Sequence, residues 1–343
     1  MIRFTGKDMI KSSNGITKQL FITASLCRTK CAVYTNQTHA HNRSRQRINM
    51  KPDTPVIELK NTSYFYASSK TKALDDASLR IYPGEKIALL GANGAGKSTL
   101  FKHLNGILKP ASGQVLVNGE EISRNNIREV RQTVGIVFQN PDDQILAPTV
   151  EQDVAFGPMN MGLPEKEVES RVAEALKLVH MSGFEERSPH HLSGGQKKLV
   201  AIAGILAMRP RVVVLDEPTA GLDPQTANQV ISVIEEMNRE LGITVILSTH
   251  DVDIVPLFAD RVYVIHHGRI EAEGTAREIF KKHEVLENAH LRMPRIAEVF
   301  ELLLESGVDV DIKITPSDAR DEILRLLGSQ AEKQRQENAN HAY

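Results

Sequence analysis

The segment GANGAGKST at 91–99 combines glycines, a lysine and hydroxyl residues at a spacing suited to binding phosphate. Glycine lets the backbone wrap closely around an anion, so the N–H groups of Gly94 and Gly96 can point at phosphate oxygens. Lys97 adds a charge that reaches the outer phosphates of a nucleotide, and the hydroxyl of Ser98 is a ligand for Mg²⁺. The strand-like KIALL precedes the segment and the helix-like TLFKHLNGIL follows it. This context predicts a phosphate-binding loop between a strand and a helix.

Two carboxylates follow one another in the apolar run VVVLDEP at 212–218. Folds that alternate strands and helices bind ligands at the carboxyl ends of their strands, so we expect Asp216 to hold Mg²⁺ directly or through water. Glu217 is expected to act as the general base that polarises the attacking water. The alternative is a solvated pair of loop carboxylates.

Gln139 and His250 also follow strand-like runs, VGIVF and TVILST. We expect both side chains at the same edge of the sheet. Gln139 has the reach to sense the metal ion or the γ-phosphate, and His250 can donate a hydrogen bond to that phosphate. The alternative for His250 is a structural role, which is the commoner one for a lone histidine.

The segment HLSGGQKK at 191–198 predicts a second anion site, with Ser193, Gly194 and Gly195 at the N-terminus of a helix. About 95 residues separate Ser193 from Lys97. One chain therefore carries two phosphate-binding segments, which raises the question of whose phosphate the second one binds.

The elements that must position these residues alternate between strand and helix. Short β-like runs fill residues 56–90, continuous apolar runs of buried parallel strands follow, and residues 166–180 form a helix with one apolar face. This pattern predicts an α/β fold with helices covering a mostly parallel sheet. Residues 285–330 are expected to form a small helical unit with Ser317 as a helix cap, and the polar tail 331–343 is expected to fray.

Charge is distributed unevenly along the 343 residues. Residues 1–49 carry nine lysines and arginines against one aspartate, so the remainder has a net charge of −9. Such a body has no broad cationic field, which argues against nucleic acid as a partner. No stretch approaches the roughly 18 uncharged apolar residues that a membrane span needs, so a membrane role requires a partner.

The first 49 residues are interpreted as a flexible leader or as sequence upstream of a true start at Met50. A transit peptide is a weaker alternative, suggested by arginine and serine content. Both cysteines, Cys27 and Cys31, lie in this leader, so the body has no disulfide and is expected to be intracellular.

In their order, these motifs resemble those of the nucleotide-binding subunit of ABC transporters over residues 55–280. Adenylate-kinase-like proteins and GTPases share the first motif and lack LSGGQ. The resemblance implies a P-loop cassette with a RecA-like core, an N-terminal antiparallel β subdomain and a helical subdomain at about 140–208. It also implies ATP and Mg²⁺ as cofactors and ATP hydrolysis coupled to transport.

The resemblance further implies the residues of the site. Glu217, His250 and Gln139 would be catalytic, and Ser98, Gln139 and Asp216 would hold the metal ion. In this family LSGGQ faces the ATP held by the other subunit, and Asp223 of the GLD turn crosses the same interface. The residues implied to contact ATP are Tyr66, Gly91, Asn93, Gly94, Ala95, Gly96, Lys97, Ser98, Thr99, Ser193, Gly194, Gly195, Gln196 and Asp223.

Tyr66 matches the aromatic residue that stacks on adenine in this family. Strand alternation puts Tyr64 on the same face of the strand, so the choice of Tyr66 rests on the resemblance. The alternative is a plain aromatic residue at a sheet edge.

The stretch FQNPDDQILAPTVEQDVAFGPMNMGL at 138–163, with STHDVDIV and LRMPRIAEVF, looks like the energy-coupling-factor branch, especially its cobalt and nickel type. There an acidic stretch receives cationic helices of an integral membrane coupling subunit, a role that Asp142 and Asp143 fit by residue type. A solvated turn is the alternative. Relatives usually carry arginine where Leu199 stands, which puts a helix-surface contact in question and leaves the phosphate contacts untouched.

The resemblance also implies partners. These are a second ATP-binding subunit, identical or a close paralogue, and a separate membrane protein that captures the substrate. The complex would place this chain on the cytoplasmic face of the cell membrane as a peripheral subunit.

Two other functions use the same motifs. Soluble ABC ATPases of DNA repair or translation usually join two cassettes or carry a long coiled-coil insert, and neither is visible in this sequence. A regulatory module that senses ATP without hydrolysing it is disfavoured because Glu217 is intact.

Overall fold

The computed structural model describes residues 54–67 and 71–340, with side chains described up to residue 328. The expected leader 1–49, with Cys27 and Cys31, lies outside the described residues. All the described residues belong to one compact unit.

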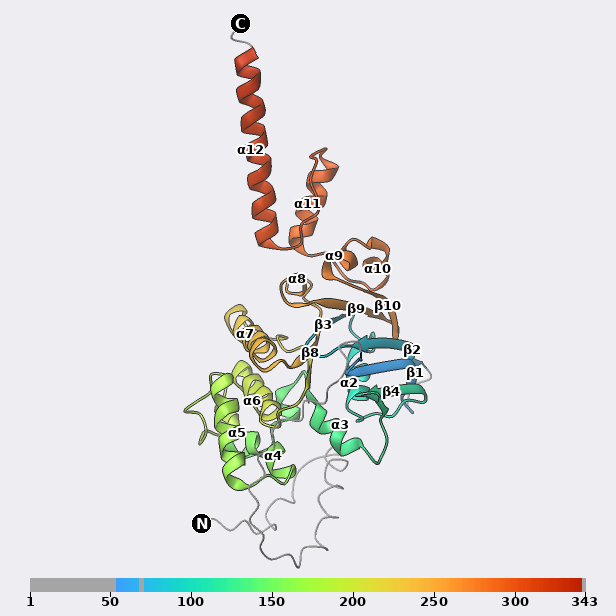
Figure 1. Cartoon of the computed structure of the whole chain (residues 1–343), viewed down its shortest axis with the longest axis vertical. Helices are drawn as coiled ribbons and strands as arrows, with labels where there is room; N and C mark the ends of the chain where they lie inside the picture. Colours follow the sequence, from blue (N-terminus) through green and yellow to red (C-terminus); the bar gives the residue numbers. More distant parts are fainter. Residues whose placement is uncertain (1–53, 68–70, 341–343) are drawn as a thin grey trace, which may run out of the picture. The chain divides into compact units, whose positions relative to one another are not determined.

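Two sheets organise the chain (Figure 1). The first is antiparallel, with strand order β2-β1-β4-β5, and the second has six strands in the order β10-β9-β3-β8-β7-β6. In the second sheet β10 is antiparallel to β9, and the other neighbours are parallel. The strands are β1 (Ile57–Phe65), β2 (Lys72–Ile81), β3 (Lys86–Leu90), β4 (Ser112–Val117), β5 (Glu120–Glu121), β6 (Val134–Val137), β7 (Val212–Asp216), β8 (Thr244–Thr249), β9 (Arg261–His266) and β10 (Arg269–Gly274).

Helices connect the parallel strands and form most of the C-terminal part. They are α2 (Lys97–Leu104), α3 (Ile127–Thr133), α4 (Val150–Asn160), α5 (Glu165–Leu178), α6 (Gly194–Leu206), α7 (Pro224–Leu241), α8 (Val255–Phe258), α9 (Ala276–Phe280), α10 (His283–Asn288), α11 (Arg295–Glu305) and α12 (Pro316–Asn340), with short 3-10 turns η1 (Pro141–Asp143) and η2 (Pro189–His191). The expected α/β class, with an antiparallel N-terminal sheet, is confirmed. Over the described residues, no helix combines the length and the apolar character needed to cross a membrane.

The parallel strands are buried on both faces, which explains their continuous apolar sequences. In β7, Val213 and Leu215 belong to one buried cluster, which also holds residues of α6 and α7. Val212 and Val214 belong to the other, with residues of α2 and of the antiparallel sheet. Successive strand residues point to opposite faces, so each strand contributes to both clusters.

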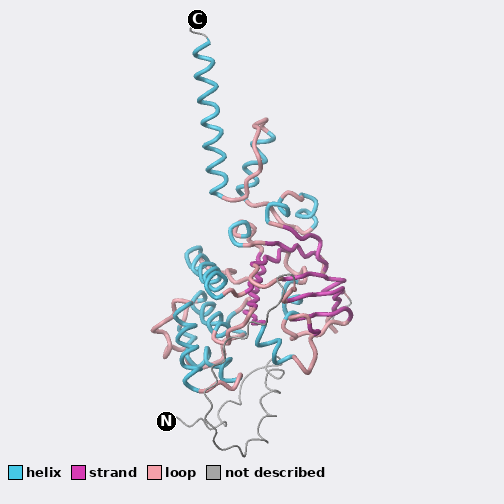
Figure 2. The backbone as a smooth tube through the Cα atoms, in the orientation of Figure 1, coloured by secondary structure: helices cyan, strands magenta, loops and turns pink. Residues whose placement is uncertain are grey.

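The helical subdomain consists of α4, α5 and α6, which pack on one another. Figure 2 shows these helices grouped beside the strands. The apolar face predicted for residues 166–180 is buried, at Val168, Val172, Leu176 and Val179. This packing holds the start of α6, which carries the LSGGQ serine at its N-cap, on a rigid three-helix base.

The C-terminal helices belong to two buried clusters. Leu286 of α10 and Ala297 of α11 are part of the main cluster, whereas Phe300 packs with Val310 and Ala319 in a small separate one. The first turn of α11 is therefore anchored in the body of the protein. The rest of α11 and α12 stabilise one another.

Two details of α12 differ from the sequence-based expectation. The Thr315 hydroxyl accepts the amide of Asp318 at 3.2 Å, so Thr315 caps this helix and the expectation for Ser317 was wrong. Pro316 explains the difference, because proline is favoured at the first helical position. The helix continues to Asn340, which covers most of the tail 331–343 that was expected to fray. Glutamine, glutamate, lysine and alanine in that tail are good helix formers.

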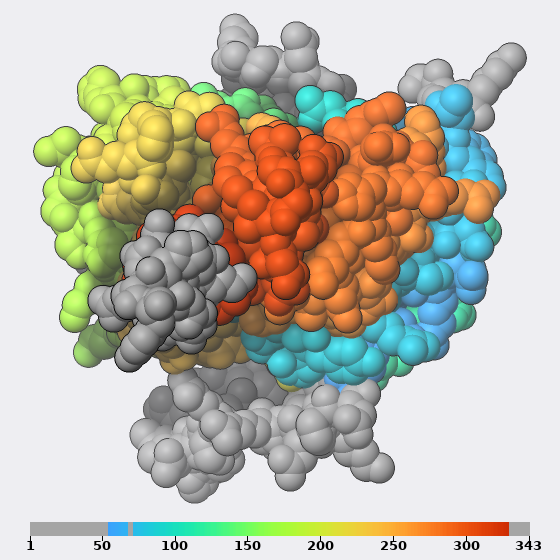
Figure 3. Space-filling view, turned by 90° about the horizontal axis from the view of Figure 1, so that it is seen from above, coloured from blue at the N-terminus to red at the C-terminus, as the bar shows by residue number. Residues whose placement is uncertain are grey.

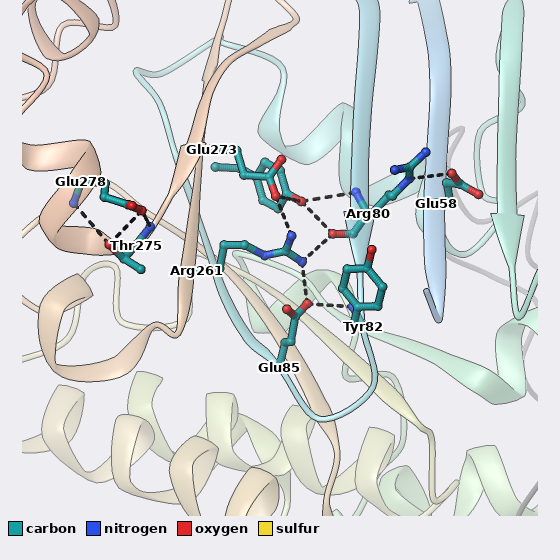
Figure 4. A network of polar contacts seen from close by, with 9 residues as sticks. Glu58, Arg80, Tyr82, Glu85, Arg261, Glu273, Thr275 and Glu278 are labelled. Carbon is teal, nitrogen blue, oxygen red and sulfur yellow. Dashed lines mark hydrogen bonds and ion pairs between the residues drawn. The ribbon is translucent and has the colours of Figure 1, made fainter. Parts of the chain in front are cut away.

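Arg261 of β9 ties the two sheets together (Figure 4). Its guanidinium donates to Glu273 Oε1 at 2.5 Å, to Glu85 Oε2 at 2.6 Å and to the backbone carbonyl of Arg80 at 2.7 Å. The charge also lies 5.3 Å from the centre of the Tyr263 ring. Since Arg80 belongs to β2 and Glu273 to β10, one side chain joins the antiparallel sheet to the edge of the parallel one.

Replacing Arg261 with methionine should lower the free energy of unfolding by about 2–3 kcal/mol, since three charge-assisted hydrogen bonds disappear and the carboxylates of Glu85 and Glu273 lose their shared cation. Urea denaturation measures this loss. Arg80→Met is the matched control, because it removes the more exposed Arg80–Glu58 ion pair from the same network. An equal loss in both variants would contradict the assignment of Arg261 as the tie between the sheets.

Candidate active site

The loop that the sequence predicts to bind phosphate lies between β3 and α2, the expected strand–loop–helix context. Gly94 and Gly96 have positive φ angles of 81° and 112°, a conformation that favours glycine. A Cβ atom on Gly91 would lie 2.4 Å from the carbonyl oxygen of Ile265, so this position has no room for a side chain. Helix α2 begins without a side-chain cap and without an acidic residue in its first turn. Its first amides are therefore suited to an anion.

Lys97 is buried at the start of α2, with 6% of its surface exposed. Its ammonium donates to the carbonyl of Gly91 at 2.7 Å and to that of Ala92 at 3.2 Å. It also lies 3.5 Å from Glu217 Oε1. The loop thus holds the cation directly beside the predicted general base.

Asp216 ends β7 and Glu217 follows it, and both are buried, which argues against the alternative of a solvated pair. The hydroxyl of Ser248, on the neighbouring strand β8, donates to Asp216 Oδ1 at 2.6 Å and accepts the amide of Glu217 at 2.9 Å. Glu217 has a φ of 44°, which is uncommon for a residue other than glycine. Such strain persists where the surroundings fix the residue, and it is concentrated at functional sites.

Gln139 and His250 meet at Glu217. The side-chain amide of Gln139 donates to Glu217 Oε2 at 3.2 Å, and His250 Nδ1 lies 3.3 Å from the same oxygen. Lys97 takes the other oxygen. Residues that follow β3, β6, β7 and β8 therefore converge on one carboxylate, at the edge where the sequence placed them.

The predicted metal ligands fit Mg²⁺ by their chemistry. Ser98, Gln139 and Asp216 offer hydroxyl, amide and carboxylate oxygens, and Mg²⁺ prefers oxygen ligands from one or two side chains together with substrate phosphates. Ser98 is exposed at the start of α2, next to the loop. Within the part of the chain that the structure describes, no cluster of three or more His, Cys, Asp or Glu side chains could hold a metal ion alone.

Tyr66 lies just past the end of β1 and is 37% exposed. Its hydroxyl is 3.1 Å from the hydroxyl of Thr99, which follows the phosphate loop. The ring of Tyr64 meets that of Tyr66 edge-on at 5.1 Å and packs on His103 on its other side. Of the two tyrosines, Tyr66 presents the more exposed ring beside the loop, while Tyr64 supports it. Of the remaining loop residues, Asn93 is exposed and Ala95 is buried.

The signature residues form a separate group at the N-terminus of α6. Ser193 accepts the amide of Gln196 at 3.3 Å, and Gln196 Oε1 accepts the amide of Ser193 at 3.0 Å, which is a capping box. The Ser193 hydroxyl keeps its own proton to donate, and Gly194 carries no side chain to cover the helix end. Gly195 packs so tightly on Thr226 that an added Cβ would lie 2.0 Å from it.

Asp223 caps the neighbouring helix α7. It accepts the amides of Gln225 and Thr226 at 3.1 and 3.0 Å and the Thr226 hydroxyl at 2.6 Å. Hydrogen bonds from Thr226 lower the pKa of Asp223. The contact between Gly195 and Thr226 brings Asp223 beside the signature. Among the described residues, no hydrogen bond or ion pair joins Ser193, Gly194 or Asp223 directly to the phosphate loop.

Sequence reasoning missed two residues of the site. Ser248 is a small polar residue in the apolar strand TVILST, which was a usable signal. Lys198 is 1% exposed, and its ammonium donates to the carbonyl of Phe138 at 3.3 Å and to that of Gln139. Burial lowers the pKa of Lys198 to about 8, against the attraction of Asp216 and Glu217. No signal in the sequence separated the buried Lys198 from the partly buried Lys197.

The predicted docking residues lie in the turn η1. Asp142 and Asp143 are both exposed. Asp142 also accepts a hydrogen bond from Lys197 of α6 at 2.7 Å. The turn that carries both aspartates is thus tied by Lys197 to the helix that carries the signature.

Comparisons with known proteins agree with this geometry. The model of the ABC transporter family matches residues 74–220. The energy-coupling factor transporter ATP-binding protein EcfA of Methanothermobacter thermautotrophicus is 55% identical over 278 residues, which is 80% of this chain and 89% of that protein. These matches confirm the resemblance drawn from the motifs.

Solved structures agree as well. The structure of cbiO1 from Clostridium perfringens, part of the ABC transporter complex cbiONQ, is 46% identical and covers 73% of this chain and 100% of that chain, with a TM-score of 0.63. A dimeric post-hydrolysis structure of the ATP-binding cassette MJ0796, bound to ADP and Pi, is 29% identical, covers 64% and 99% of the two chains and has a TM-score of 0.58. This chain therefore belongs to the ABC transporter ATP-binding family, in its energy-coupling-factor branch, and is an ATPase that couples the hydrolysis of ATP, with Mg²⁺, to transport.

Proposed function

We propose that this chain powers a membrane importer for cobalt, nickel or another small nutrient by working as one half of an ATPase dimer. The observation that carries the proposal is the division of the site. Lys97, Gln139 and His250 surround Glu217, while Ser193 and Asp223 form a separate group. A second subunit, identical or a paralogue, would bring its own Ser193 and Asp223 to this chain's nucleotide.

Each residue has a role in the proposed reaction. The amides of the loop and Lys97 bind the phosphates, and the ring of Tyr66 is exposed for contact with adenine. Ser98, Gln139 and Asp216 hold Mg²⁺, which neutralises charge on the phosphates when it is bound. Glu217 accepts the proton of the attacking water, and His250 donates to the γ-phosphate. A phosphate in the loop offers Lys97 a stronger partner than the carbonyls, which frees Glu217 for its role.

The proposed dimer is supported by the hydrogen-bonding groups left free at the N-terminus of α6. Its capping box leaves the hydroxyl proton of Ser193 and the first amides of α6 available for an anion. Contacts across two nucleotides would hold the dimer until hydrolysis removes the bridging charge, after which the subunits separate. The dimeric cassette bound to ADP and Pi shows that a relative assembles as a dimer.

Docking on a membrane subunit is supported by the segment around η1 and α4. It combines the exposed carboxylates Asp142 and Asp143 with exposed Leu146, Phe156 and Met159. Exposed apolar side chains beside acidic ones suit a partner with a cationic and apolar surface. Such a partner would compete with Lys197 for Asp142, whose carboxylate is itself exposed and can exchange one cation for another. This docking would place the chain on the cytoplasmic face of the membrane.

The cargo follows from resemblance. The stretch 138–163 and the motifs STHDVDIV and LRMPRIAEVF favour the cobalt and nickel type, and the 46% identity to cbiO1 supports the same group. A separate membrane protein would capture the substrate. A soluble ATPase of repair or translation is not favoured, since the relatives are named as transporter subunits.

Glu217→Gln should hold MgATP and accumulate as a dimer, because the docking contacts form while the general base is missing. Hydrolysis should fall by about 100-fold or more. Size-exclusion chromatography with MgATP measures the dimer, and phosphate release measures the rate. Glu240→Gln, an exposed change on α7, is the matched control and should behave as wild type. A Glu217→Gln protein that stays monomeric with MgATP would contradict the dimer proposal.

Ser193→Arg places bulk and charge where the partner's phosphate would lie. We expect ATP binding close to wild type and loss of turnover, measured by calorimetry and by phosphate release. Ser170→Arg, on the exposed face of α5 in the same subdomain, should keep turnover. Thermal denaturation separates this effect from the loss of the helix cap, which costs about 1 kcal/mol. Normal turnover in Ser193→Arg would mean that the signature does not act across subunits.

A further inference from the structure

Two segments singled out in the sequence, STHDVDIV and LRMPRIAEVF, are bonded to each other. The guanidinium of Arg292 donates to Asp253 Oδ2 at 2.6 Å, and the backbone amide of Arg295 donates to Asp253 Oδ1 at 2.8 Å. Both oxygens of one carboxylate thus bind the segment that opens α11. Figure 3 shows the face of the molecule on which the C-terminal segments, coloured orange to red, are seen from above.

Asp253 supplies something that α11 lacks. This helix begins after Pro294, which offers no side-chain cap. The Asp253 carboxylate accepts the amide of the first helical residue and places negative charge at the positive end of the helix. Burial raises the pKa of Asp253, but hydrogen bonds from Arg292 and from the Arg295 amide outweigh it and hold the pKa below its usual value. The link is therefore charged near neutral pH.

A chain of short-range hydrogen bonds leads from Asp253 back to the end of β8. The amide of Asp253 donates to Asp251 Oδ1 at 3.1 Å, and the amide of Asp251 donates to Thr249 Oγ1 at 3.0 Å. His250 lies inside this chain, and its Nδ1 is 3.3 Å from Glu217 Oε2. The backbone that carries His250 is thus fixed at one end by the strand and at the other by the C-terminal unit.

The small contribution of such ion pairs to stability indicates that the Arg292–Asp253 pair has another role. Arg292 and Asp253 are both partly exposed, and exposed ion pairs contribute little to stability. Their geometry can matter far more, because a displacement of about 1 Å at a reacting group costs on the order of 100-fold in rate. A pair in this place is better suited to orienting a loop than to stabilising a fold.

We propose that Asp253 and Arg292 are positioning residues, through which the C-terminal unit holds the His250 segment in the geometry that ATP hydrolysis needs. The inference rests on the proposed role of His250. It gives the unit around residues 285–330 a function in turnover that is separate from nucleotide binding.

The test measures kcat and KM for ATP in the full chain for Asp253→Asn, Arg292→Gln and the double variant. Asparagine keeps the size and an acceptor for the Arg295 amide, so it removes the charge of the link alone. We expect kcat to fall about tenfold in each single variant, with KM within about twofold of wild type. The double variant should be no slower than the singles, because both break the same link. Arg292→Lys should restore part of the rate.

Arg325→Gln is the matched control. It removes a guanidinium–carboxylate bond to Glu322 inside α12, of the same kind but away from the His250 segment. This variant should keep kcat, and all variants should share the thermal midpoint of wild type. Loss of kcat together with a lowered midpoint in Asp253→Asn and Arg292→Gln would overturn the positioning role, since a structural role predicts that pattern.

His250→Ala separates the two proposals. If it keeps the wild-type kcat, the proposed role of His250 fails, and the positioning inference fails with it. If it loses activity while Asp253→Asn and Arg292→Gln keep theirs, the proposed function survives and the positioning inference alone is wrong.

Discussion

The buried carboxylate of Glu217 is the point at which distant parts of the chain meet. A charge removed from water must be compensated, and here Lys97, Gln139 and His250 all contribute to that compensation. These residues follow three different strands of one sheet. The Glu217 carboxylate can therefore keep all its contacts only when the segments of Lys97, Gln139 and His250 are correctly placed. The positive φ of Glu217 is tolerated because the surrounding bonds fix it.

Helix ends determine how the two predicted phosphate sites differ. Helix α2 starts at Lys97 without a side-chain cap, so its first amides are suited to an anion held by the preceding loop. Helix α6 is capped by Ser193, yet the hydroxyl proton and the neighbouring amides stay available. Helix α7 is capped by Asp223, beside the same signature. The uncapped start of α2 lies with Glu217 and its partners, whereas the capped starts of α6 and α7 lie together in a separate group. This separation is the physical basis for proposing that two chains share each nucleotide.

Side chains that join elements explain how the site is held. Arg261 joins the two sheets, Lys198 joins the signature helix to the carbonyl of Gln139, and Asp253 joins the histidine segment to α11. None of these residues needs to touch the nucleotide. Lys198 and Asp253 connect the segments of Gln139 and His250, whose side chains contact Glu217, to other parts of the fold. A change in one element can therefore reach the carboxylate of Glu217 through a short series of bonds.

The sequence by itself determined the family, the α/β class, the place of Lys97 between a strand and a helix, and the strand-end positions of Gln139, Glu217 and His250. It could do so because glycine spacing, continuous apolar runs and the shared edge of parallel strands are local or periodic properties. Tertiary structure alone decided the contacts of Lys198, Arg261 and Asp253. Those outcomes depend on which elements pack together across long sequence separations, and a lysine, an arginine or an aspartate has the same appearance in a sequence whether its partner is water or a buried carbonyl.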